Sequence, residues 1–192
     1  MSFWNVIKGL INSTDVREAR LDSSTHTMQT IEYAHHEVHG GSHFTFCASD
    51  GDLDSGQVIE FILTTPDTTK WAHLIASAYG ALHTKLEIYE DTTHTTGAAQ
   101  TAYNNNRNSG TAATITINAS NDDNADGTLI FSSEWGIDTG AGTNKKSGGG
   151  ESRGDSEWVL KQNTKYLVRV ESQTADNVAD LCLSWYEHTD KD

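Results

Sequence analysis

The sequence predicts an all-β protein, an antiparallel β-sandwich that is jelly-roll-like, preceded by a short N-terminal arm that is helical or extended. Short runs rich in Val, Ile, Thr and aromatic residues recur between clusters of Gly, Asp, Asn and Ser, as strands do between turns. Several runs alternate apolar and polar side chains, as Ile115 and Ile117 do with their threonine neighbours. A hydrophobic share of 35% is low for a chain of 192 residues, which favours a thin two-layer core.

The expected strands follow one another along most of the chain. They cover residues 28–38, 43–49, 57–64, 71–79, 82–90, 112–118, 127–133, 156–160, 164–173 and 179–188. Two longer polar segments, residues 91–111 and 136–155, are expected to be loops. Loops of more than about 12–15 residues in a compact domain usually have a function or are disordered. Residues 27–192 are therefore predicted to form one sandwich domain with one buried face per sheet.

Residues 1–26 are predicted to form an N-terminal arm with a polar connector. The arm carries an apolar set with helical spacing, namely Phe3, Trp4, Ile7, Leu10 and Ile11. A helix this short is marginal in water unless it packs against something. Two interpretations stay open: the arm folds back over the sandwich, or it docks in a groove on a partner or a sister subunit.

The formal net charge is −14, from 13 basic and 27 acidic residues. Nucleic-acid binding needs a basic surface that displaces phosphate counterions, so the sequence argues against a nucleic-acid partner. The same charge argues against docking on an anionic membrane. No run approaches the 18 apolar residues that would span a membrane, so no membrane partner is expected.

The N-terminus lacks the basic start and the long apolar stretch of a signal peptide. The chain is therefore expected to be made and used without secretion. Two cysteines are too few for the disulfide framework of a small secreted domain. Cys47 and Cys182 are accordingly predicted to be reduced thiols in the core or on the surface.

A histidine cluster is a candidate transition-metal site. On a strand, His35, Glu37 and His39 share one face, with about 6.6 Å between successive Cα atoms of the set. Imidazole and carboxylate can complete a zinc site at that spacing. The segment misses the helical zinc-protease motif by one spacer residue, and the glycine pair that follows would end such a helix. The competing interpretation, which the sequence favours, is a polar strand whose imidazoles hydrogen-bond to neighbours or to another subunit.

Two acidic segments are candidate calcium sites. In residues 50–56 the carboxylates of Asp50, Asp52 and Asp54 occupy alternate positions. Residues 122–127 resemble the first half of an EF-hand loop, but Ser133 stands where the last ligand, a Glu, is required. Acidic residues are also common in tight turns, which is the competing interpretation. The sequence requires no cofactor, and calcium and zinc are predicted only if the acidic segments or the histidine cluster bind a metal.

Catalytic motifs are absent from the sequence. It has no nucleophile elbow, and the glycine-rich stretch from residue 140 lacks the spacing of a phosphate loop. The protein is therefore predicted not to be an enzyme. An enzyme that uses a metal held by His35, Glu37 and His39 is the rival hypothesis.

Four stretches together resemble small virion-associated proteins of tailed bacteriophages. They are TIEYAHHEVHGGSHF (30–44), TTPDTTKWAHLIASA (64–78), AYNNNRNSG (102–110) and EWVLKQNTKYLVRVES…LCLSWYEH (157–188). The similarity covers most of residues 22–188, and residues 1–21 lie outside it. The resemblance implies a head decoration (cement) protein on the outer surface of the virion head, assembled in the host cytoplasm, with no catalytic residues.

By this resemblance the protein is expected to bind the major capsid protein as a homo-oligomer, a trimer or a dimer, and to stabilise contacts between capsomers. The expected contacts are the apolar arm residues and Arg107 in the first long loop. The alternative function is a virion-surface module that recognises host carbohydrate, assisted by calcium in an acidic loop. Its candidate stacking platforms are Trp71, Trp135, Trp158 and Tyr103.

Overall fold

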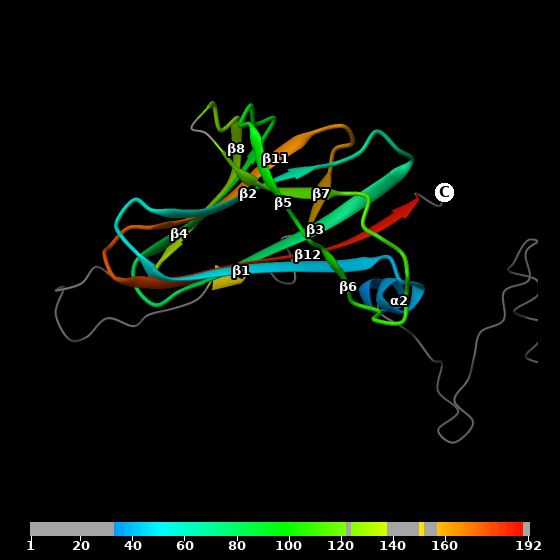
Figure 1. Ribbon diagram of the computed structural model, residues 1–192, viewed down its shortest axis with the longest axis horizontal. Helices are drawn as coiled ribbons and strands as arrows, with labels where there is room; N and C mark the ends of the chain where they lie inside the picture. Colours follow the sequence, from blue (N-terminus) through cyan, green and yellow to red (C-terminus); the bar gives the residue numbers. More distant parts are fainter. Residues whose placement is uncertain (1–32, 122–123, 138–149, 152–156, 190–192) are drawn as a thin grey trace, which may run out of the picture. The chain divides into compact units, whose positions relative to one another are not determined.

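Two antiparallel sheets packed against each other make up the described part of the chain, which comprises residues 33–121, 124–137, 150–151 and 157–189 of the computed structural model (Figure 1). The chain divides into two units, Met1–Tyr33 and Ala34–Asp192, and both sheets belong to the second. The predicted arm at residues 1–26 lies outside the described residues, as does most of the predicted loop at residues 136–155. An all-β sandwich is therefore confirmed for the described residues.

The strands of the first sheet are β1 (His43–Leu53), β3 (Lys70–Gly80), β6 (Tyr103–Asn104), β9 (Gly150–Glu151), β10 (Trp158–Leu160) and β12 (Asn177–Thr189). Their order is β10-β3-β12-β1-β6, and β9 also pairs with β3. The strands of the second sheet are β2 (Val58–Thr64), β4 (Thr84–Glu90), β5 (Thr96–Gln100), β7 (Thr116–Ser120), β8 (Thr128–Trp135) and β11 (Lys165–Ser172). Their order is β5-β7-β2-β11-β4-β8.

The strand order identifies the sandwich as a jelly roll. When the strands between β4 and β8, namely β5, β6 and β7, and the two-residue β9 are left out, eight main strands remain. The first sheet then has the order β1-β12-β3-β10, and the second has the order β2-β11-β4-β8. If the eight strands are renumbered 1 to 8 along the chain, these orders are 1-8-3-6 and 2-7-4-5. This order of two four-stranded sheets is that of a jelly roll, as the sequence predicts.

The segment between β4 and β8 corrects the prediction of a polar loop at residues 91–111. Within it β5 pairs with β7, which pairs with β2, and β6 pairs with β1. The insertion thus adds edge strands to both sheets. The other expected strands after residue 42 are confirmed with ends within two residues, except that β1 runs four residues further and β7 begins four residues later.

The core lies between the two sheets and is built from alternate residues of their strands. Fully buried members include Phe44, Leu74, Ile88, Tyr166, Val168, Leu181, Leu183 and Trp185. The rings of Phe44 and Trp185, on the neighbouring strands β1 and β12, lie with their centroids 5.8 Å apart. Because strand side chains alternate, a slip of one residue would move each of these apolar side chains to the opposite face.

Residues 33–40 form the helix α2 (Tyr33–Gly40), so the strand predicted for residues 28–38 is wrong where the structure describes it. The helix ends in a Schellman motif. The Gly41 N–H donates to the Val38 carbonyl at 3.2 Å, and the Ser42 N–H donates to the Glu37 carbonyl at 3.0 Å. Gly41 has a φ of 75°, which favours glycine. Among the described residues, no helix is long and apolar enough to cross a membrane.

One buried carboxylate fastens the inserted segment to the first sheet. Glu187 of β12 is 2% exposed, and it accepts hydrogen bonds from the backbone N–H groups of Thr114 at 2.9 Å and Ile115 at 3.1 Å. It also accepts from the Thr114 hydroxyl at 2.6 Å and from Trp185 Nε1 at 3.0 Å. Removal of this carboxylate would leave several buried donors without partners, which is costly.

We predict that Glu187→Ala lowers the free energy of unfolding by about 3 kcal/mol or more, because several buried donors lose their acceptor at once. Glu187→Gln should cost less, since an amide oxygen still accepts. Urea unfolding followed by tryptophan fluorescence measures both. The control Glu171→Ala removes a partly exposed carboxylate 4.0 Å from Lys85 Nζ and should cost under about 0.5 kcal/mol. Equal losses for the two alanine variants would contradict the assignment.

Candidate functional site

The outer face of the first sheet is the face turned away from the core, and the strand register assigns its side chains. Directly opposed residues of an antiparallel pair point to the same face, and alternate residues of each strand follow them. From β12 the outward residues are Val178, Asp180, Cys182, Ser184, Tyr186 and His188. The neighbouring strands add Trp71, His73, Ile75, Ser77 and Tyr79 from β3, His43, Thr45 and Cys47 from β1, Val159 from β10 and Tyr103 from β6.

Exposed large apolar side chains are concentrated on this face. Among the described residues they are Val58, Trp71, Tyr79, Tyr103, Leu129, Val159 and Val178. Five of these seven, all except Val58 and Leu129, lie on the outer face of the first sheet. Trp71 and Val159 lie near His73 at one end of the β3–β12 pair, Tyr79 and Val178 lie at the other end, and Tyr103 lies on the edge strand β6.

A cluster of imidazoles surrounds Tyr186 on the same face. The ring of His73 stacks on Tyr186 with centroids 4.5 Å apart, and the rings of His188 and His43 lie 5.9 and 6.3 Å from it. The Tyr186 hydroxyl donates to Glu157 Oε1 at 2.7 Å, and the same oxygen contacts His73 Nδ1. Burial lowers the pKa of His43, so its ring is neutral at pH 7. These contacts explain why Tyr186 is buried on an outward-facing row.

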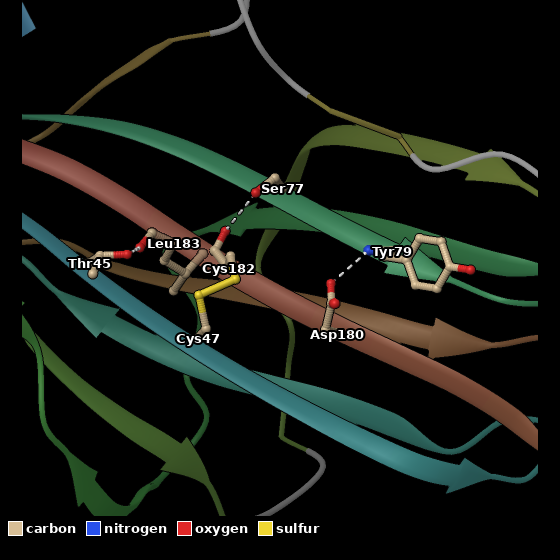
Figure 2. The surroundings of a disulfide bond; sticks show 7 residues. All are labelled: Thr45, Cys47, Ser77, Tyr79, Asp180, Cys182 and Leu183. Atoms are coloured by element: carbon tan, nitrogen blue, oxygen red, sulfur yellow. Dashed lines mark hydrogen bonds between the residues drawn. A yellow bond between two sulfur atoms is a disulfide. The ribbon is translucent and has the colours of Figure 1, made fainter.

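Cys47 and Cys182 form a disulfide on this face, so the prediction of reduced thiols is wrong (Figure 2). The two residues lie opposite each other on β1 and β12, with Cα atoms 4.2 Å apart. Figure 2 also shows the Ser77 hydroxyl, which donates to the Cys182 carbonyl at 3.4 Å from β3. The cysteines are 135 positions apart in the sequence, and only the strand pairing brings them together.

We predict that the double variant Cys47→Ala/Cys182→Ala loses about 2–4 kcal/mol of unfolding free energy, because the disulfide constrains a long loop in the unfolded chain. Denaturant unfolding without reductant measures this loss. A reducing agent should destabilise the wild type to the level of the variant and leave the variant unchanged. Two titratable thiols in wild-type protein purified without reductant would refute the disulfide.

The outer face of the second sheet carries a charged cluster centred on Arg169 of β11. The guanidinium donates to both carboxylate oxygens of Asp126 at 2.8 and 2.9 Å, and to Glu60 at 2.7 Å. It also lies 5.7 Å from the centre of the Tyr89 ring. Asp126 belongs to the second predicted calcium segment, but in the structure its carboxylate pairs with the Arg169 guanidinium.

The same aspartate belongs to an arrangement that contains the groups of a hydrolase triad. His94 Nε2 lies 2.9 Å from Asp126 Oδ1, and His94 Nδ1 lies 2.7 Å from Ser120 Oγ. In such triads the carboxylate holds Nδ1 and the serine faces Nε2, which is the reverse of this geometry. The His94 side chain is also fully buried, and Arg169 binds the aspartate. We therefore interpret these residues as a structural ion-pair network.

Burial raises the pKa of Asp126, but the hydrogen bonds and charge of Arg169 outweigh burial and hold this pKa below its usual range. Such a group stabilises the fold above its ordinary pKa of about 3.9, and the contribution is lost as the pH falls through the lower folded value. We predict that Asp126→Asn destabilises the protein at pH 7, and that its difference from the wild type shrinks below about pH 4. Urea unfolding at pH 7, 5, 4 and 3 measures this trend; a difference independent of pH would contradict it.

The structure separates the three residues of the predicted zinc site. Because α2 is a helix, His35 and His39 share one face at a spacing of four residues, with their Nε2 atoms 3.0 Å apart. Glu37 is buried instead, where it accepts a hydrogen bond from the Ser42 hydroxyl and contacts His36 Nδ1 at 3.2 Å. Within the described ranges, no three or more His, Cys, Asp or Glu side chains are arranged to hold a metal.

The first predicted calcium segment is largely a strand, not a loop. Asp50 and Asp52 lie on β1, and Asp54 follows its end. Asp50 Oδ1 accepts a hydrogen bond from the Asp52 N–H at 3.0 Å, and the Asp54 N–H donates to the Gln57 side-chain oxygen at 2.8 Å. The register with β12 shifts between Asp50 and Leu53, as at a β-bulge. These aspartates therefore shape the end of β1.

Arg107 follows β6, and its guanidinium lies 5.5 Å from the centre of the Tyr103 ring. Tyr103 is 55% exposed and Trp71 is 37% exposed, so both rings are accessible on the outer face of the first sheet. The other two predicted stacking platforms, Trp135 and Trp158, are partly buried and pack against the core. The predicted arm contacts Phe3, Trp4, Ile7, Leu10 and Ile11 lie outside the described residues.

The four stretches at residues 30–44, 64–78, 102–110 and 157–188 each contribute at least one strand to the first sheet. In chain order they supply α2 with the start of β1, then β3, then β6, and finally β10 and β12 together with β11 of the second sheet. Residues of the third stretch also form hydrogen bonds to the first stretch. Side-chain amides of Asn104 and Asn106 donate to the carbonyls of Gly41 at 2.7 Å and His39 at 3.1 Å. The sequence alone gives no signal that these stretches share one sheet.

Comparison with protein family models, with curated proteins and with solved structures gave no match for this chain. Fold and site therefore define the class of protein: a jelly-roll sandwich with an apolar and imidazole-rich outer sheet face. The function has to be inferred from the chemistry of that face, because a jelly roll by itself serves many functions.

Proposed function

We propose that the protein is a non-enzymatic virion structural protein that decorates the outer surface of a bacteriophage head and stabilises contacts between capsomers. The observation that carries the proposal is the outer face of the first sheet. Each stretch with virion-protein resemblance contributes a strand to that sheet, and five of the seven exposed large apolar side chains of the described residues lie on that face. The partner would be the major capsid protein, bound by a homo-oligomer through several contacts at once.

The physical character of this face supports a binding role. Its strands are held by extended pairing and by the Cys47–Cys182 disulfide, so little conformational entropy would be lost on binding. Asp180 is the one acidic residue among the outward positions of β3 and β12. The central parts of protein interfaces are likewise poor in charged residues and rich in aromatic ones.

The disulfide supports a role in the released particle. Disulfides persist in oxidising surroundings and are rare in reducing cytosol. A protein assembled onto a particle in the cytoplasm could form this bond after the particle leaves the cell. The bond would then strengthen the sheet that contacts the capsid, where the shell has to withstand conditions outside the host.

In this proposal the N-terminal arm adds a second contact. Its apolar residues would bury area on the capsid protein or on a sister subunit. At about 25 cal/mol per Å², burial of a few hundred Å² supplies several kcal/mol per arm before the entropy cost.

We predict that Trp71→Ser/Val159→Ser weakens binding to undecorated heads by about tenfold or more, because it removes two exposed apolar side chains from the proposed contact face. Sedimentation of purified protein with undecorated heads measures the affinity, and cryo-electron microscopy of saturated heads shows which face contacts the shell. The matched control Val58→Ser/Leu129→Ser removes the two exposed large apolar side chains that the described residues place on the second sheet, and it should bind as the wild type does.

Deletion of residues 1–11 in the same assay separates the two contacts. If the truncated chain saturates heads as tightly as the full chain, the arm has no part in binding, and the sheet face alone carries the proposal. If neither the double variant nor the full chain binds heads above background, the decoration function is wrong.

The carbohydrate alternative is favoured by one observation, the exposed rings of Trp71 and Tyr103 with Arg107 beside the second ring. Aromatic rings offer flat apolar faces on which a sugar ring can stack. Binding of the wild type to host glycans, abolished by Trp71→Ser and accompanied by no binding to heads, would favour this function over decoration.

A further inference from the structure

We propose that His73 and His188 form a two-imidazole site for a divalent transition metal on the outer face of the first sheet. The geometry of this pair supports the site independently of the decoration function. Neither histidine belongs to α2, the helix that carries the earlier zinc hypothesis.

The two rings are brought together by strand pairing. Tyr186 is opposite His73, and Trp71 is opposite His188, so the two histidines are diagonal neighbours on one face of the β3–β12 pair. Their Nε2 atoms lie 2.8 Å apart, and their ring centroids lie 4.8 Å apart. The two nitrogens therefore point at each other across the strands.

The partners of the other nitrogen in each ring assign the tautomers. His188 Nδ1 lies 3.0 Å from the Thr189 carbonyl, which can only accept, so Nδ1 carries the hydrogen. His73 Nδ1 contacts the carboxylate of Glu157, which likewise only accepts when ionised. The Tyr186 hydroxyl lies 3.1 Å from His73 Nδ1 and 2.7 Å from the same oxygen of Glu157, and we assign its proton to the shorter contact, with the carboxylate.

In these tautomers the two Nε2 lone pairs face each other at 2.8 Å and repel unless a cation, either a proton or a metal ion, lies between them. A transition metal satisfies both. With a zinc–nitrogen distance of about 2.0–2.1 Å and tetrahedral geometry, two ligand nitrogens lie about 3.3 Å apart, so the rings need to separate by only about half an ångström.

The surroundings match those of metal-ligating histidines. Such histidines usually donate their other ring N–H to a carboxylate or a backbone carbonyl, which fixes the tautomer and orients the ring. Glu157 and the Thr189 carbonyl occupy these positions here. Since the described residues bring no third His, Cys, Asp or Glu ligand to a metal, water or an external donor would complete the coordination. Imidazole ligands favour Zn²⁺, Ni²⁺ and Cu²⁺ over Ca²⁺ or Mg²⁺.

The α2 histidines provide a matched control. His35 and His39 also have their Nε2 atoms close, at 3.0 Å, but both residues are exposed. Among the described residues, the Nδ1 atoms of this pair have no hydrogen-bond partner, so nothing fixes their tautomers. The two pairs therefore differ in the support of their rings while presenting the same two donor atoms.

Isothermal titration calorimetry of the full, untagged chain with Zn²⁺ tests the site. We expect one site in the wild type that is unchanged by His35→Gln/His39→Gln, weakened at least tenfold by His188→Gln, and weakened about tenfold by Glu157→Gln, whose effect reports on ring orientation. With Cu²⁺, electron paramagnetic resonance should show two nitrogen ligands in the wild type and fewer in His188→Gln. Circular dichroism of the metal-free variants confirms their folding.

Two results would overturn the proposal. If the wild type binds no Zn²⁺ or Cu²⁺, a proton and not a metal joins the two rings. If the α2 double variant loses binding while His188→Gln keeps it, the metal binds on the helix.

Discussion

Strand β12 is the element on which the rest of the structure depends, because it pairs along most of its length with β1 on one side and β3 on the other. The two-residue period of a strand divides its side chains into two rows. One row, which includes Leu183 and Trp185, enters the core. The other, which includes Cys182 and His188, forms the centre of the outer face. A shift of one residue would exchange the rows, exposing the apolar side chains and separating the cysteines.

This single register accounts for three features that are far apart in the sequence. It places Cys182 opposite Cys47, it stacks Tyr186 on His73, and it sets His188 diagonal to His73. The disulfide, the aromatic stack and the facing imidazoles thus have a common origin in the pairing of β1, β12 and β3. Each of them in turn opposes a register shift, because a covalent bond and buried aromatic contacts would be lost together.

The sequence predicted the parts of this fold that local patterns determine. Alternating runs such as those of β4, β11 and β12 locate strands because one face of each is buried. The strand predicted for residues 28–38 is wrong from residue 33 onward, because the histidines and Val38 of α2 show no clear helical period and the signal for the helix lies in its C-cap at Gly40 and Gly41. The sequence did not predict the edge strand β5, because its residues, TGAAQ, include no large β-branched or aromatic side chain that would indicate a strand.

Contacts between distant segments could not be predicted in this way. Cys47 and Cys182 are 135 positions apart, and His73 and His188 are 115 positions apart. Their proximity depends on which strands pair and in which register, and this information is spread over the whole core. The metal hypothesis based on residues 35–39 failed for the opposite reason: it relied on a local spacing that is correct for a strand, whereas the segment is a helix.

The two outer faces of the sandwich differ in their polar groups: charged side chains on the second sheet are paired with one another, whereas the first sheet exposes apolar side chains. This difference bears on where a partner would bind. On the second sheet, Arg169 is held by Asp126 and Glu60, and Lys85 lies 2.6 Å from Glu87. Covering such a network would require its ions to be desolvated without new partners. The first sheet presents exposed apolar side chains such as Trp71 and Val159, whose burial is favourable. For this reason the proposed partner is placed on the first sheet and not on the second.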